Sequence, residues 1–169
     1  MERQSPVALI LSARAKYHAG DLAGALETLD RAIRQRPPSA LLTLRARLKI
    51  LKGRRQSAFA DLSRAIRIDP LNTDPLLVRG LLYYCESDLK RAREDIVAAL
   101  PKLTDDPTKD YANLWIWLID SRLGDRVEAS KSLQAYREKR PPEKEGDWYD
   151  TIVLYLLKEI SESELFRNT

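Results

Sequence analysis

Histidine and cysteine, which often bind metal ions or act in nucleophilic catalysis, are rare in this sequence and lie far apart. His18 is its only histidine and Cys85 its only cysteine. None of the motifs Gly-x-x-x-x-Gly-Lys, His-Glu-x-x-His and Cys-x-x-Cys occurs. Carboxylate pairs at residues 94–95 and 105–106 fit a helix surface and a linker better than acid–base catalysis. Because catalysis needs several such groups close together, we expect no enzymatic activity, no metal site and no cofactor.

The composition indicates a helical domain without a membrane span. The chain has 169 residues, of which 44% are hydrophobic and 32% charged. No apolar run approaches the roughly 20 residues that a spanning helix needs. The stretch PVALIL at residues 6–11, followed by SARA, resembles the end of a signal peptide but is too short for one. We therefore expect a cytoplasmic protein as the sequence stands, and a periplasmic one if a leader was removed.

A pattern of Gly, two Ala and Pro recurs along the chain. It occurs first as Gly20, Ala25, Ala32 and Pro37, and 33 positions later as Gly53, Ala58, Ala65 and Pro70. Weaker copies follow at Ser87, Ala92 and Ala99, and at Gly124, Ala129 and Pro141. Repetition with this period is typical of stacked helical hairpins. Gly closes the first helix of each hairpin, the Ala residues allow close packing, and Pro stops the second helix.

The recurring Gly and Pro residues also predict where the helices begin and end. We expect them at about 6–19, 21–36, 40–52, 55–68, 73–86 and 88–100, with a fourth hairpin over 111–140. Asp21, Asp88 and Asp125 can cap the second helices. Residues 101–110 are predicted to form the longest linker and a hinge. Trp117 stands where the other units have a small residue, which predicts a splayed fourth hairpin.

The pattern resembles the tetratricopeptide repeat, and the resemblance covers residues 6 to about 141. It implies an all-α fold, a right-handed α-solenoid of about four helix-turn-helix units. The units are expected at about 6–38, 39–72, 73–106 and 110–141, within a repeat array over residues 1–140. Residues 141–169 are expected to form C-terminal capping helices, since the exposed end of a solenoid needs a cap.

The tail is also similar to that of bacterial NlpI-type tetratricopeptide lipoproteins. The similarity rests on Trp148, on Tyr155 with Leu156, and on the ISESEL stretch over residues 160–165. Within that stretch, Ser161 with Glu164 is predicted to form a capping box, and Ile160 with Leu165 a hydrophobic staple. Members of that family are adaptors and often dimers. The resemblance implies a bacterial source and leaves a homodimer open for this chain.

Family resemblance also implies a binding groove lined by the first helix of each unit. Its sixteen positions here are Ile10, Arg14, Tyr17, His18, Thr43, Arg47, Ile50, Leu51, Leu77, Leu81, Tyr84, Cys85, Leu114, Leu118, Ser121 and Arg122. This apolar and aromatic set with three Arg favours a helix or extended peptide that carries acidic residues. We expect the protein to be a scaffold or adaptor that binds a partner protein there. Packing of the same residues against the tail or a second subunit remains the alternative.

Two further functions stay open at this point. A secretion or pilus-assembly chaperone with one cognate client uses three to four repeats at this length. Nucleic-acid binding is the least favoured function, and it rests on the charge distribution, +8 over residues 1–70 and −4 over residues 71–169. A basic half can attract an acidic partner of either kind, while a solvated helical surface rich in Arg explains the same charges.

Overall fold

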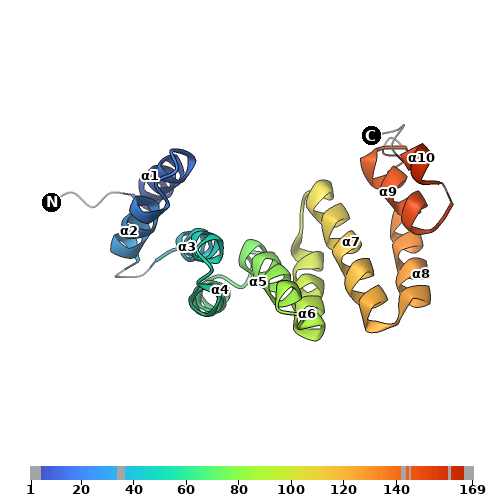
Figure 1. Ribbon diagram of the computed structural model, residues 1–169, viewed down its shortest axis with the longest axis horizontal. Coiled ribbons are helices and arrows are strands. Elements are labelled where there is room, and N and C mark those ends of the chain that lie inside the picture. Colours follow the sequence, from blue (N-terminus) through green and yellow to red (C-terminus); the bar gives the residue numbers. More distant parts are fainter. Residues whose placement is uncertain (1–4, 34–36, 142–143, 145, 160, 166–169) are drawn as a thin grey trace. The chain divides into compact units, whose positions relative to one another are not determined.

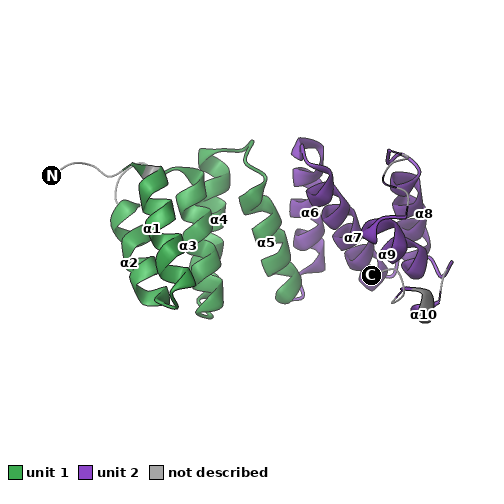
Figure 2. Ribbon diagram, turned by 90° about the horizontal axis from the view of Figure 1, so that it is seen from above, with its two compact units in different colours: residues 1–86 green, residues 87–169 purple. Residues whose placement is uncertain are grey.

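The computed structural model describes residues 5–33, 37–141, 144, 146–159 and 161–165. By its internal packing the chain divides into two compact units, residues 1–86 and 87–169 (Figure 2). In the described residues every regular element is a helix (Figure 1). These two units do not test the four predicted repeat boundaries, which stay predictions.

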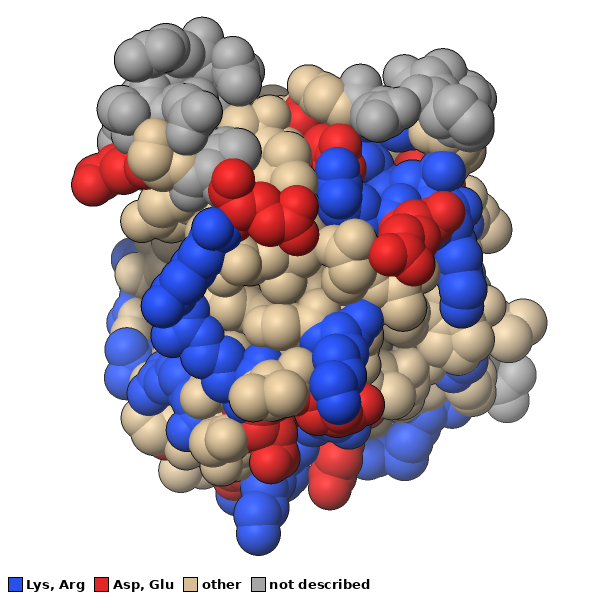
Figure 3. All heavy atoms as spheres, turned by 90° about the vertical axis from the view of Figure 1, so that its right-hand side faces the viewer, with Lys and Arg blue, Asp and Glu red and all other residues tan. Residues whose placement is uncertain are grey.

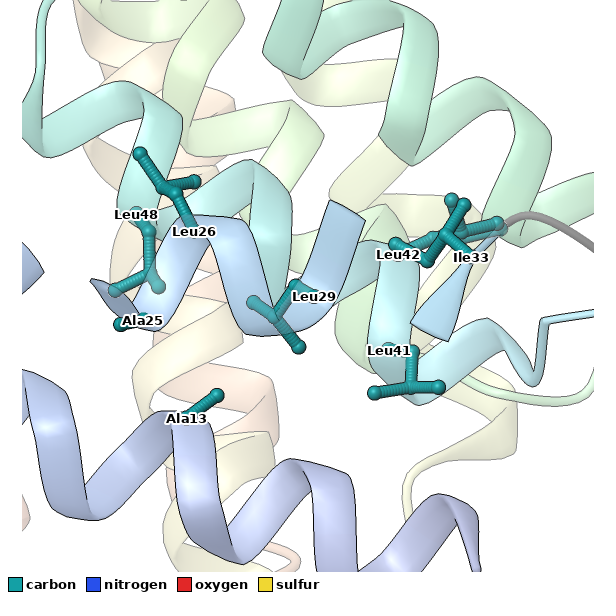
Figure 4. Packing of buried hydrophobic residues seen from close by; sticks show 9 residues of the cluster. Ala13, Ala25, Leu26, Leu29, Ile33, Leu41, Leu42 and Leu48 are labelled. Carbon is teal, nitrogen blue, oxygen red and sulfur yellow. The ribbon is translucent and has the colours of Figure 1, made fainter. Parts of the chain in front are cut away.

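Unit 1 consists of two complete helical hairpins and the first helix of a third. Its helices are α1 (Pro6–His18), α2 (Leu22–Ala32), α3 (Ser39–Leu51), α4 (Arg55–Ile68) and α5 (Asp74–Cys85). These bounds agree with the sequence prediction to within one or two residues, except at the end of α2, where the prediction extended to residue 36 and residues 34–36 lie outside the described ranges. Small residues bring paired helices together, because Ala13 on α1 and Ala25 on α2 are fully buried in one cluster with Leu29 (Figure 4). Ala46 and Ala58 take the same places in the second hairpin.

Unit 2 begins at the turn after α5. It contains α6 (Leu89–Ala99), a 3₁₀ turn η1 (Leu100–Lys102), α7 (Asp106–Leu123), α8 (Arg126–Arg137), α9 (Trp148–Leu156) and α10 (Glu162–Leu165). Trp117, Ala129, Leu133, Tyr149 and Val153 form its buried cluster. Helix α9 therefore covers the α7–α8 hairpin with two fully buried side chains, as expected of a cap.

The predicted linker over residues 101–110 is wrong in extent. Residues 100–102 continue α6 as the 3₁₀ turn, and α7 begins at Asp106 instead of Tyr111. Asp105 Oδ1 accepts a hydrogen bond of 2.8 Å from the N–H of Thr108, which caps the helix. Pro107 lies in the first turn of α7, where its missing N–H has no helical partner to lose. The acidic residues read as a linker are a cap and the first turn of a long helix.

The hairpin turns share a left-handed residue. Gly20, Gly53 and Gly124 have φ values of 81°, 70° and 103°, and Ser87 takes the same place with a φ of 62°. Ser87 is therefore strained at this turn, because a side chain disfavours the left-handed region. After the turns, Asp21 and Asp88 cap α2 and α6 through their carboxylates.

Asp125 and Trp117 lie in the α7–α8 hairpin, and the sequence predicted a structural role for each. Asp125 precedes α8 but makes no side-chain capping bond, which corrects that prediction. Trp117 is buried against the small Ala129, and its Nε1 donates to Ser130 Oγ at 3.2 Å. The predicted capping box and staple in the tail involve Ile160 and the side chain of Glu164, which lie outside the described residues.

Candidate functional site

The groove residues predicted for unit 1 lie on α1, α3 and α5, the first helix of each hairpin. Helix α3 contacts both α1 and α5, so these three helices are neighbours. On α1, Arg14, Tyr17 and His18 are exposed and Ile10 is half-buried. The rings of Tyr17 and His18 lie 5.4 Å apart between centroids. This helix therefore presents an aromatic pair beside a cation to solvent.

The α3 positions divide between surface and core. Leu51 is 59% exposed and Ile50 is half-buried, so both offer apolar surface. Thr43, in contrast, is 1% exposed, and its hydroxyl donates to the backbone carbonyl of Ser39 at 3.0 Å. The repeat position alone did not reveal this burial. Thr43 serves the packing of α3 and leaves little surface for a partner.

Helix α5 continues the apolar part of the set. Leu77, Leu81 and Tyr84 are all half-buried, which leaves part of each side chain accessible. Arg47 on α3 forms an ion pair with Asp74 at the start of α5. Both side chains are 51% exposed, so the pair contributes little to stability. Solvent screens the two charges, so either residue can pair with a charged group of a partner instead.

In unit 2 the predicted residues lie on α7. Leu114 and Leu118 are half-buried and pack against the cluster that includes Trp117, Tyr149 and Val153. Arg122 is exposed. Part of the apolar surface predicted to bind a partner thus already packs against the buried cluster of unit 2, to which α9 contributes Tyr149 and Val153.

An exposed aromatic pair was missed by the sequence reasoning. Tyr111 on α7 is 56% exposed and Trp148 on α9 is 36% exposed. Their ring centroids lie 4.9 Å apart, with 30° between the ring planes. Tyr111 precedes Leu114 and Leu118 at helical spacing, which is the signal that could have found it. Trp148 belongs to the tail, where the repeat numbering does not reach.

A buried ion network holds α9 in place beside this pair. Arg140 Nη2 donates to Asp110 Oδ2 at 2.9 Å and to Asp147 Oδ2 at 2.6 Å. Asp147 in turn caps α9 by accepting from the N–H of Asp150 at 3.0 Å. Burial lowers the pKa of Arg140, but the hydrogen bonds and charges of Asp147 and Asp110 outweigh it, so the pKa is raised overall. Arg140 is therefore charged at every accessible pH.

The network extends to the body of α9 through Asp150. Arg137 Nε donates to Asp150 Oδ1 at 2.8 Å, and the backbone N–H of Gly146 donates to Oδ2 at 3.0 Å. Burial raises the pKa of Asp150, yet these hydrogen bonds and the nearby positive charges lower it overall. Asp150 thus stays ionised and ties α9 to the end of α8.

A second ion network lies in unit 1 and uses two cations of α3, Arg45 and Lys49. Asp61 is buried and accepts from Arg45 Nη2 at 2.6 Å and from Lys49 Nζ at 2.7 Å. Arg45 also pairs with the exposed Asp30 at 2.7 Å. Because α3 uses these cations to hold α2 and α4, they are not available to a ligand in the folded protein.

The described residues show no other arrangement with evident chemistry. No group of three His, Cys, Asp or Glu among them could hold a metal ion. Two hollows of about 160 and 230 Å³ in unit 2 are lined by side chains of both charges. Figure 3 views the side on which α8 to α10 lie in Figure 1, and there Lys and Arg are interspersed with Asp and Glu. In the part of the chain that the structure describes, no helix is long and apolar enough to cross a bilayer.

Comparison with known proteins gives related folds. No family model matches the sequence. A curated relative, the SGT1 homolog of Bos taurus, is 26% identical over 153 residues, which cover 86% of this chain and 43% of the relative. The chain thus spans less than half the length of that relative.

Two solved structures show the architecture. A tetratricopeptide repeat protein from Parabacteroides merdae superposes with a TM-score of 0.70 at 22% identity, covering 98% of this chain and 71% of that one. The TPR-like repeats of a putative kinesin light chain from Podospora anserina give 0.71 at 17% identity, covering 98% and 95%. The helical-hairpin units and these superpositions confirm the predicted fold: the chain has the all-α tetratricopeptide-repeat fold.

Proposed function

We propose that the protein is a non-enzymatic scaffold or adaptor that binds a segment of a partner protein on the first helices of its hairpins. The observation that carries this proposal is the exposure of Tyr17 and Leu51, which are 40% and 59% exposed on neighbouring helices of unit 1. Aromatic side chains and Arg are the usual anchors of protein interfaces, and Leu51 adds apolar surface beside them. The exposed Arg14 next to them favours a partner segment with acidic residues.

Affinity capture from native lysate tests this proposal. We would compare the wild type with Tyr17→Ala/Leu51→Glu and read the captured proteins by mass spectrometry. Both side chains are exposed, so the variant should fold, as circular dichroism would verify. Leu71→Glu is the matched control, because Leu71 is 78% exposed in the turn between α4 and α5. A protein captured by the wild type and the control but not by the double variant supports the proposal. Equal capture by all three would refute it.

The alternatives receive different support. A chaperone with one cognate client would use the same face, and the identity of the captured protein distinguishes it from a general adaptor. Nucleic-acid binding loses support because Arg45 and Lys49 are engaged in ion pairs with the buried Asp61. It predicts that affinity falls steeply as salt rises, and a flat salt response of any captured nucleic acid would exclude it.

A further inference from the structure

Helix α9 places two large side chains in the core of unit 2. Tyr149 and Val153 are both fully buried, in one cluster with Trp117 of α7 and with Ala129 and Leu133 of α8. They lie four residues apart, so they share one face of α9. Trp117, Ala129 and Leu133, here called the receiving surface, therefore accept one face of a helix.

Two ion pairs hold the same helix to the end of α8. Arg137 donates to both carboxylate oxygens of Asp150, at 2.8 and 3.2 Å. Arg140 donates to both oxygens of Asp147, at 3.2 and 2.6 Å. Asp147 precedes α9 and Asp150 lies in its first turn. Two guanidinium groups thus receive two carboxylates that lie three residues apart, each in the bidentate geometry that gives strong and specific pairs.

The residues that make these contacts define a sequence pattern. In chain order they are Asp147, Tyr149, Asp150 and Val153, which gives Asp-x-Tyr-Asp-x-x-Val. The Tyr149 hydroxyl is buried and has no hydrogen-bond partner among the described residues. The receiving surface therefore accepts the ring of Tyr149, and a Phe ring would make the same contacts. A helix of another protein that carries this pattern can make the contacts that α9 makes.

Helix α9 is suited to replacement by another helix. It spans nine residues, Trp148–Leu156, and an isolated helix of this length is not stable in water. Its helical form therefore depends on the contacts just described, and the unpaired Tyr149 hydroxyl makes the docked state less stable than a fully paired one. Leu114 and Leu118 of α7, which belong to the predicted binding groove, pack against the same cluster. A partner bound on that part of α7 would compete with α9.

We propose that the α7–α8 hairpin is a helix-binding site that α9 occupies in its own chain, and that a partner helix with the pattern Asp-x-Tyr/Phe-Asp-x-x-Val binds there by displacing α9. This inference rests on the scaffold function proposed above and adds a class of partner for unit 2. Because α9 is tethered beside the site, it competes at a high effective concentration. Only a partner that makes the same contacts and adds others outside the site displaces it.

A fluorescein-labelled peptide of residues 144–159 is the probe. Fluorescence anisotropy would compare its binding to wild type and to Tyr149→Ala/Val153→Ala, which removes the two buried side chains of α9 and leaves the receiving surface unchanged. This variant should bind the peptide at least about tenfold more tightly than wild type, a difference of about 1.4 kcal/mol. Adding Val127→Glu, at a 73% exposed position of α8, should leave that affinity unchanged. Equal binding to wild type and the double variant, no binding to either, or a loss caused by Val127→Glu would overturn the proposal.

Altered peptides test the pattern itself. Ala at the positions of Tyr149 and Val153, or Asn at those of Asp147 and Asp150, should each weaken binding to the double variant by about tenfold or more. Phe in place of Tyr149 should bind at least as tightly as the parent peptide. Unchanged affinity after either of the first two changes, or a loss of binding with Phe, would overturn the proposal.

A cross-linked form tests displacement with the buried side chains of α9 intact. The rings of Tyr111 on α7 and Trp148 on α9 lie 4.9 Å apart between centroids. Tyr111→Cys/Trp148→Cys, combined with Cys85→Ser, can be joined by a short bismaleimide. At high peptide concentration the unlinked form should bind the peptide, and the linked form should bind it at least about tenfold more weakly. Equal binding by the two forms, or binding by neither, would overturn the proposal even if the double variant fails to fold.

Failure of this proposal is distinguishable from failure of the scaffold function. The peptide assays need no native partner, whereas capture from lysate tests Tyr17 and Leu51 in unit 1. If the peptide does not bind but Tyr17→Ala/Leu51→Glu loses a captured protein, the scaffold function stands and the helix site does not. Sedimentation velocity of wild type should give a monomer. A dimer that cross-linking abolishes would show that α9 exchanges between two copies of the chain, which would also overturn the assignment to a partner protein.

Discussion

Arg140 and Asp110 form an ion pair with 2.9 Å between Nη2 and Oδ2, and only 6% and 3% of their side chains are exposed. The two residues are 30 positions apart in the sequence. Their pairing joins the chain just after α8 to the second turn of α7. The same guanidinium holds Asp147, the cap of α9. One buried cation thus connects three helices of unit 2.

Replacing this cation should destabilise unit 2 strongly. Arg140→Ala leaves the buried Asp110 carboxylate without its ionic partner, which we expect to lower the free energy of unfolding by about 3–5 kcal/mol. Urea unfolding followed by tryptophan fluorescence reports on unit 2, because Trp115, Trp117 and Trp148 are the only tryptophans of the chain. Lys131→Ala is the control, since its pair with Glu128 is 69% and 73% exposed. That variant should change stability by less than about 1 kcal/mol, and equal losses in both would contradict the prediction.

Acid should weaken the attachment of α9. The pKa values of Asp147 and Asp150 are lowered in the folded protein, because hydrogen bonds and charges of Arg140 and Arg137 outweigh burial, which acts to raise them. The unfolded carboxylates have pKa values of about 3.9. Below that pH the unfolded state binds more protons, so stability that is complete above it is lost as pH falls through the folded pKa values.

The measurement is the urea midpoint of tryptophan fluorescence from neutral pH to about pH 3. Wild type should lose stability over the acidic part of this range. Asp150→Asn should be less stable at neutral pH and should show a flatter decline in acid. If the variant declines as steeply as wild type, Asp150 does not contribute to the acid response.

The sequence predicted the helical hairpins well because their ends carry specific residues. Gly53 closes α3, and Asp21 caps α2, each by a local mechanism that needs no tertiary information. The start of α7 was missed because Asp105 and Pro107 are as common in linkers as in helix caps. Local residue types could not distinguish the two.

The candidate site was predictable only in part. The repeat positions named Tyr17 and Leu51, and both side chains are exposed, while their part in binding stays a prediction. The burial of Thr43 depends on how neighbouring helices pack around it. The stacking of Tyr111 on Trp148 joins residues of two helices, one of them outside the repeat pattern. Contacts of this kind require the tertiary arrangement.

The buried carboxylate of unit 1 should also be essential for stability. Asp61→Ala leaves Arg45 and Lys49 without their shared partner, and their side chains are only 16% and 14% exposed. We expect a loss of about 3–5 kcal/mol, measured by far-ultraviolet circular dichroism because unit 1 has no tryptophan. Asp30 is the other partner of Arg45, and its side chain is 58% exposed. Asp30→Ala should therefore lower the free energy of unfolding by less than about 1 kcal/mol. Similar losses in the two variants would show that burial does not govern these pairs.

Two equivalent turn positions, Ser87 and Gly53, can be exchanged for each other's residue type to test the cost of the left-handed conformation. Ser87 has a φ of 62° where Gly53 of the preceding hairpin has 70°. A non-glycine residue in the left-handed conformation costs about 1–2 kcal/mol. Glycine removes this cost, but it also raises the entropy of the unfolded chain, which offsets part of the stabilisation. Ser87→Gly should therefore raise the free energy of unfolding by about 0.5–1 kcal/mol. Gly53→Ser should lower it by a similar amount, since nothing lies within 4 Å of a Cβ at that position and backbone strain is the only penalty. Urea unfolding monitored by circular dichroism measures both. Opposite signs confirm that the turn conformation sets the difference, and destabilisation by Ser87→Gly would show that the serine side chain stabilises this turn.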